Sequence, residues 1–127
     1  MSFFAPPRRV ETTVFNRLPD RFRKPRYSAW ADANRDRLEI DGPGGPDGLT
    51  LDIEGCLLIA HEGFGSVWRL SPHAEPLDRI VSCTARATMN LAFGGPDNAR
   101  LFIVESETGS ILQADLLTPG LPMFSHL

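Results

Sequence analysis

The sequence predicts an all-β protein built from short strands, and three observations support this prediction. The chain has 127 residues, of which 11 are Gly and 11 are Pro, so turns are frequent. Short segments rich in apolar and β-branched residues follow one another after residue 48, with Gly or Pro at most of the joints. Parts of this series also recur at a nearly fixed distance. The predicted strands are residues 49–53, 56–61, 66–70, 77–82, 89–93, 101–105 and 110–114.

The repeat distinguishes between the all-β architectures. Its period is 42 to 44 residues, with a small drift in one turn. A period of about 40–50 residues with four strands per repeat is typical of β-propeller blades. The first repeat supplies four strands and the second supplies three, so the sequence predicts a partial β-propeller of about two four-stranded blades. The matching segments are residues 49–51 with 91–93, 57–61 with 101–105, and 65–69 with 109–113.

The N-terminal part is predicted to complete the second blade. The β-rich segment 10–18 can form a strand, and pairing it with the last blade would remove an exposed sheet edge. The residues that follow it show no sustained period of a strand or a helix. The predicted organisation is a disordered leader at 1–9, a strand at 10–18, a long connection at 19–44, two blades at 45–116 and a C-terminal tail at 117–127.

Composition argues against several classes of partner. A formal net charge of −3 gives no electrostatic case for binding nucleic acid. No apolar run approaches the ~20 residues that a membrane helix needs, and the N-terminus lacks the apolar stretch of a secretory signal. The two cysteines, Cys56 and Cys83, form no disulfide framework or metal motif. We expect both to be reduced core residues of a cytoplasmic protein.

Asp47 is the leading candidate for chemistry. It lies between Pro46 and Gly48, at the entry to a predicted innermost strand, where a carboxylate can point into a propeller channel. Such a hard oxygen ligand suits Ca²⁺, Mg²⁺ or Mn²⁺, and the same group could act as a general base on metal-bound water. The alternative is that Pro-Asp-Gly is only a turn sequence, in which the aspartate bonds to its own backbone.

Three further polar residues occupy corresponding places in the repeat. Asn90 is at the start of the second blade's inner strand and could face the channel or act as a cap. His61 and Glu105 each end the second strand of their blade, so they are expected either to rim a common pocket or to be partly exposed strand ends. His61 and Asn90 are therefore our candidate substrate-binding residues.

Three motifs follow one another along the chain: Gly45-Pro46-Asp47-Gly48-Leu49, Ala60-His61-Glu62-Gly63-x-Gly65-x-Val67-Trp68, and Asn90-Leu91-Ala92-Phe93-Gly94-Gly95-Pro96-Asp97. In this order they resemble the gluconolactonase/regucalcin (senescence marker protein) family. The similarity covers about residues 40–116, with a short additional match near the N-terminus. It implies a six-bladed β-propeller that hydrolyses a sugar lactone with one divalent cation (Ca²⁺, Zn²⁺, Mn²⁺ or Mg²⁺) in its central channel.

The resemblance also implies roles for individual residues. Asp47 matches the family aspartate that binds the metal and is the proposed base. A second family ligand is a glutamate near the N-terminus, for which Glu39 in Leu38-Glu39 is the nearest equivalent. Family members run to about twice this length or more. The middle blades of those proteins have no counterpart in this chain, where they would fall between about Asn34 and Gly42.

Two functional hypotheses follow from the sequence. The first is a gluconolactonase-like sugar-lactone hydrolase, or a truncated relative, in which metal-activated water attacks the lactone carbonyl and Asp47 takes the proton. The second is a catalytically inactive propeller fragment that acts as an interaction module or an oligomer. Open blade edges and faces are adhesive, so self-association is expected in the second case.

Overall fold

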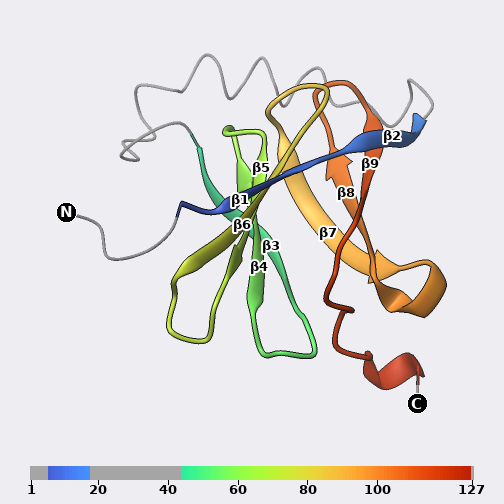
Figure 1. Ribbon diagram of the computed structural model, residues 1–127. Helices are drawn as coiled ribbons and strands as arrows, with labels where there is room; N and C mark the ends of the chain where they lie inside the picture. Colours follow the sequence, from blue (N-terminus) through green and yellow to red (C-terminus); the bar gives the residue numbers. More distant parts are fainter. Residues whose placement is uncertain (1–5, 18–43, 127) are drawn as a thin grey trace.

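The computed structural model describes residues 6–17 and 44–126, which form two antiparallel-rich β-sheets packed face to face (Figure 1). The prediction of an all-β fold with propeller-type sheets is confirmed. The first sheet has the order β1(Arg8–Glu11), β6(Pro76–Val81), β5(Ser66–Leu70), β4(Leu57–Glu62) and β3(Gly45–Leu51). The second sheet has the order β2(Thr13–Arg17), β9(Ser110–Asp115), β8(Arg100–Glu105) and β7(Thr88–Gly94).

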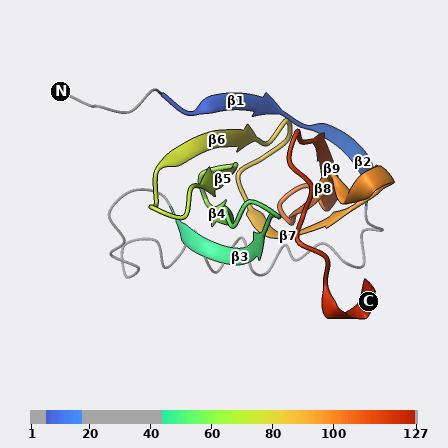
Figure 2. The ribbon, with the colours of Figure 1, turned by 60° about the horizontal axis from the view of Figure 1, so that its bottom comes forward.

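The N-terminal segment pairs with both sheets, and Figure 2 shows it running along β6 and then β9. β2 is antiparallel to β9 and gives the second sheet its fourth strand, as expected. The segment does not form the expected single strand. It divides at Thr12 into β1 and β2, and β1 pairs parallel with β6 of the first sheet. The Thr12 hydroxyl donates to the carbonyl of Val81 (2.7 Å) and accepts the N–H of Cys83 (2.9 Å). These bonds hold the crossover point between the two sheets.

Some predicted boundaries need correction. The expected leader at 1–9 extends too far, because Arg8 and Arg9 already pair with β6. The predicted connection at 19–44 lies outside the described residues except for Gly44. Cys56 is buried as expected, whereas Cys83 is exposed in the loop after β6, so the prediction of two core cysteines is wrong for Cys83. Among the described residues, no helix is long and apolar enough to cross a membrane.

The core lies between the two sheets, and strict alternation along the strands builds it. In β8 every second residue is buried, and β4, β6 and β9 show the same alternation over most of their length. Side chains of adjacent residues in a strand point to opposite faces, so each sheet directs one face inward. Each fully buried Val, Leu or Ile side chain contributes about 1.5–3 kcal/mol to stability. The fully buried members are Leu58, Ala60, Val67, Ile80, Leu101, Ile103 and Leu112.

The segment after β9 ties the two sheets together at one end. The N–H of Gly120 donates to the carbonyl of Asn98 (2.8 Å), and the N–H of Leu121 donates to the carbonyl of Leu51 (2.9 Å). Gly120 packs directly on the ring of Phe93, where any Cβ would overlap that side chain. The first residues of the expected tail at 117–127 therefore belong to the folded body.

Candidate functional site

Asp47 lies in a β-bulge at the edge of the first sheet. β3 pairs with β4 at Pro46 and again at Leu49, and the register shifts between these two positions. Asp47 is one of the extra residues in the bulge, and bulges of this kind turn a side chain away from the regular ladder. Its side chain is exposed, and its carboxylate accepts no hydrogen bond from the described residues. The alternative of an aspartate bonded to its own backbone therefore has no support in the structure.

Asn90 stands next to this bulge, on the edge strand of the second sheet. Gly48 and Asn90 approach so closely that a Cβ added to Gly48 would lie 2.9 Å from the Cα of Asn90. Only glycine fits at this position, and its small size brings β3 and β7 side by side (Figure 1). The Oδ1 of Asn90 accepts the N–H of Leu91 (2.9 Å), which is the capping bond of the alternative reading. The structure thus brings Asp47 and Asn90 to one place, at the facing edges of the two sheets.

A second carboxylate lies close to Asp47. Glu62 ends β4 and pairs with Gly45 across the strands. Burial raises the pKa of the Glu62 carboxyl, and the negative charge of Asp47 raises it further, while His61 acts in the opposite direction. The sequence offered no signal for this neighbour, because only the strand register places Glu62 near the bulge.

Replacing Glu62 with Gln should stabilise the protein at neutral pH. A raised pKa means that the folded protein holds this proton more tightly than the unfolded chain does, so the ionised carboxylate costs stability above that pKa. We expect a gain of up to about 0.5 kcal/mol in the free energy of unfolding at neutral pH. The gain should vanish below a pH of about 4, where both states are protonated. Urea denaturation at both pH values measures it, and an equal gain at both would contradict this explanation.

His61 is engaged in an aromatic cluster. The indole Nε1 of Trp68 donates to Nδ1 of His61 (3.2 Å), and the imidazole stacks on Phe64 with 4.8 Å between ring centroids. The guanidinium of Arg79 lies 4.7 Å from the centroid of Phe64. The backbone of His61 pairs with Pro46, beside the bulge. Its role as a substrate-binding residue remains a prediction.

Glu105 does not share a pocket with His61, so this expectation is wrong. Its side chain is fully buried between the sheets and accepts hydrogen bonds at both oxygens. These bonds secure the turn after β8 and the loop before β7, which is a structural role. The donors are the N–H groups of Ala87, Glu107 and Thr108 and the hydroxyls of Thr84 and Thr108.

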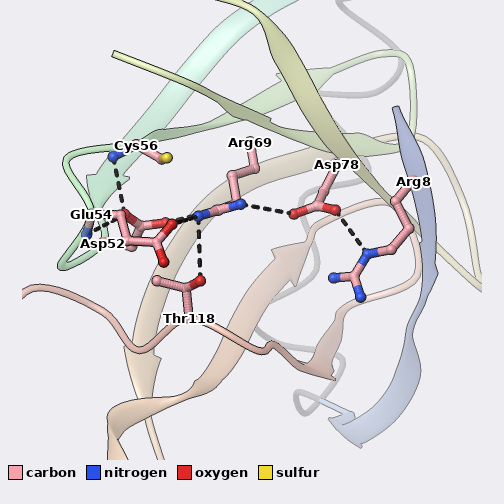
Figure 3. Close-up of polar contacts among 7 residues, drawn as sticks. All are labelled: Arg8, Asp52, Glu54, Cys56, Arg69, Asp78 and Thr118. Carbon is pink, nitrogen blue, oxygen red and sulfur yellow. Dashed lines mark hydrogen bonds and ion pairs between the residues drawn. The ribbon is translucent and has the colours of Figure 1, made fainter. Parts of the chain in front are cut away.

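A larger ionic cluster lies between the sheets, away from Asp47 (Figure 3). Arg69 is at its centre. Burial alone would lower the pKa of Arg69, but the hydrogen bond and charge of Asp52 raise it above its usual range. A cavity of about 210 Å³ opens at this cluster, but the side chains around it already satisfy one another. The guanidinium donates to Asp52 (2.7 Å), Glu54 (2.8 Å), Asp78 (3.3 Å) and Thr118 (3.3 Å), and Arg8 donates to Asp78 (2.9 Å).

Comparison with known proteins gives the family. Residues 22–107 match the family model described as the SMP-30/Gluconolactonase/LRE-like region, which is more than half of the chain. The chain belongs to this family. The resemblance inferred from the Pro-Asp-Gly and Gly-Pro-Asp motifs is confirmed.

The relatives of this SMP-30/gluconolactonase-type chain are much longer. It is 32% identical to regucalcin of Xenopus laevis over 66 residues, which is 52% of this chain and 22% of that protein. It is 32% identical to regucalcin of Danio rerio over 78 residues, which is 61% of this chain and 26% of that protein. The structure of regucalcin from Agrobacterium tumefaciens, a calcium-binding protein, matches with a TM-score of 0.55 and 25% identity, over 61% of this chain and 30% of that one. The matched region is therefore less than a third of each relative.

A family cation site is not complete in the described residues. A hard cation takes about six to eight oxygen ligands. Residues 6–17 and 44–126 contain no group of three or more His, Cys, Asp or Glu side chains that could hold a metal ion. The second predicted ligand, Glu39, lies outside these ranges. Asp47 and the amide of Asn90 can contribute oxygens at the sheet edges, but alone they do not make a metal centre.

Proposed function

We propose that this chain carries the base-bearing part of a sugar-lactone hydrolase, with Asp47 as the general base. The observation that supports this most is the position of its carboxylate. Asp47 projects from a bulge in the edge strand of the first sheet without a hydrogen-bond partner among the described residues, and Asn90 of the neighbouring sheet lies against the next residue, Gly48. A general base must come within hydrogen-bond reach of the proton that it accepts, and an accessible carboxylate without a hydrogen-bond partner can do so.

The proposed reaction is hydrolysis of the lactone ester bond. The oxygen of a water molecule attacks the lactone carbonyl carbon while the Asp47 carboxylate accepts a proton from that water. The bond between the carbonyl carbon and the ring oxygen then breaks, and the proton held by Asp47 passes to the ring oxygen, which gives an open-chain hydroxy acid and restores the Asp47 carboxylate. Asn90 can hydrogen-bond to the sugar through its amide, and His61 offers an oriented ring near the same edge.

The proposed cofactor is one divalent cation, Ca²⁺, Zn²⁺, Mn²⁺ or Mg²⁺. Asp47 is its proposed ligand, and Glu39 is the second candidate. Because the described residues do not complete its coordination shell, we assign no step of the reaction to the cation. For the same reason we expect slow turnover from this chain.

Hydrolysis of gluconolactone by the purified chain tests this proposal. Acid release should exceed the buffer rate when Mn²⁺, Zn²⁺ or Ca²⁺ is added, and chelation should return it to the buffer rate. No release above buffer with any ion would favour the second candidate, a catalytically inactive interaction module. That candidate is supported by the apolar sheet faces described next.

A further inference from the structure

Each sheet has an outer face on which no other described strand packs, although Phe64 and Arg79 contact Trp68 on the first of these faces. In the first sheet, Leu49 pairs with Ile59 and Ile59 with Trp68, so these side chains form one row across three strands. Leu51, Leu57 and Leu70 form the next row on the same face. Leu49 is 59% exposed and Leu51 is 43% exposed. We call this apolar surface the outer face of the first sheet.

The second sheet has an apolar outer face as well. Phe102, Val104 and Ile111 alternate with the buried core residues of β8 and β9 and point away from the first sheet. Phe15 of β2 packs edge-on against Phe102, with ring centroids 5.0 Å apart, and is 54% exposed. This surface is the outer face of the second sheet.

The sequence repeat relates these outer faces to the buried interface inside the chain. Leu58, Ala60 and Val67 belong to the buried inner face of the first sheet. Their counterparts 44 positions later are Phe102, Val104 and Ile111, on the outer face of the second sheet.

The relation also holds in the other direction. Leu101, Ile103 and Leu112 are buried on the inner face of the second sheet. Their counterparts 44 positions earlier are Leu57, Ile59 and Trp68, on the outer face of the first sheet. The two outer faces are therefore repeats of two surfaces that already bury each other within the chain.

We propose that the outer face of the second sheet in one copy binds the outer face of the first sheet in a second copy. This head-to-tail contact is heterologous, since each partner uses a different surface. The proposal goes beyond the catalytic one and does not depend on it. The proposed contact has no equivalent of the ionic cluster around Arg69. The repeat counterpart of Arg69 is Gln113, which carries no charge and cannot form those ion pairs. Association is thus weaker than the internal packing and depends on protein concentration.

Analytical ultracentrifugation of the full chain, from micromolar to millimolar concentration, tests the proposal. The sedimentation coefficient should rise with concentration. Leu49→Glu on one outer face and Phe15→Glu on the other should each weaken association at least about tenfold. Leu117→Glu is the matched control, because Leu117 is 83% exposed and belongs to neither face. A native chain that stays monomeric, or a control variant that dissociates equally, would overturn the proposal.

Mixing the two variants tests the head-to-tail arrangement itself. The Leu49→Glu copy keeps its second-sheet face, and the Phe15→Glu copy keeps its first-sheet face, so the mixture should form a heterodimer that grows no further. Circular dichroism confirms that both variants are folded. A mixture that remains monomeric would overturn the arrangement, because a heterologous contact must be restored by these two intact faces.

Discussion

Replacing Arg69 with Met should lower the free energy of unfolding by about 3–5 kcal/mol, because it leaves a buried carboxylate without its cation. Asp52 is fully buried, and its Oδ2 accepts the Nε–H of Arg69 at 2.7 Å. Asp78 is also buried, and of its two ion pairs among the described residues it would keep the one with Arg8. The loss would also free Thr118 in the segment that ties the two sheets together. Urea denaturation followed by tryptophan fluorescence measures the change.

Two variants sharpen this prediction. Arg69→Lys keeps the charge but cannot reach several acceptors at once, so its loss should be intermediate. Arg100→Met is the matched control, because Arg100 pairs with the exposed Asp115 at the surface. Exposed pairs contribute little to stability, so its denaturation midpoint should hardly move. Equal midpoints for Arg69→Met and the native chain would show that the cluster does not hold the sheets together.

Replacing Glu105 with Gln should cost about 2–4 kcal/mol, since it puts an amide donor where five donors converge. The N–H of Glu107 (2.9 Å) and the N–H of Ala87 (3.2 Å) share one oxygen of Glu105. The other oxygen accepts the N–H of Thr108 (3.0 Å) and two hydroxyls. An NH₂ group at either position repels its donors and leaves them unpaired in the interior.

The same substitution at Glu107 is the control, because this residue is in the same turn but is exposed. Glu107→Gln should keep nearly the full stability in the same urea titration. If Glu105→Gln unfolds at the native midpoint, Glu105 does not have the structural role assigned to it.

Much of the fold could be predicted from the sequence, because period-two patterns and the repeat are local signals. They predicted β3 to β9 and the pairing of the N-terminal segment with the last blade, but not the pairing of β1 with β6. The break at Thr12 could not be predicted, because it depends on bonds to Val81 and Cys83, far along the chain. The early start of β3 at Gly45 was also missed, because a bulge carries the pairing past Asp47.

The sequence predicted part of the site, because the repeat indicates where a residue lies along its strand but not whether it is buried. The repeat gave Asn90 nearly the strand position of Asp47, one residue further on, and in the structure Asn90 lies against Gly48, next to Asp47. Repeat-equivalent residues are not buried alike, because the face that the first sheet turns toward the core is the repeat counterpart of the face that the second sheet turns outward. His61 therefore joins a partly buried aromatic cluster, whereas its counterpart Glu105 is fully buried. The same reversal explains the two apolar outer faces.

The most direct test of the central claim is the rate of gluconolactone hydrolysis by Asp47→Asn beside Asp97→Asn, with a divalent cation present. Asp97 follows the same Gly-Pro dipeptide and is also exposed, and its positive φ of 57° is one that asparagine tolerates. If Asp47 is the base, Asp47→Asn loses about 100-fold or more of the rate above buffer, while Asp97→Asn keeps the native rate. An Asp47→Asn variant that hydrolyses the lactone as fast as the native chain would contradict the account.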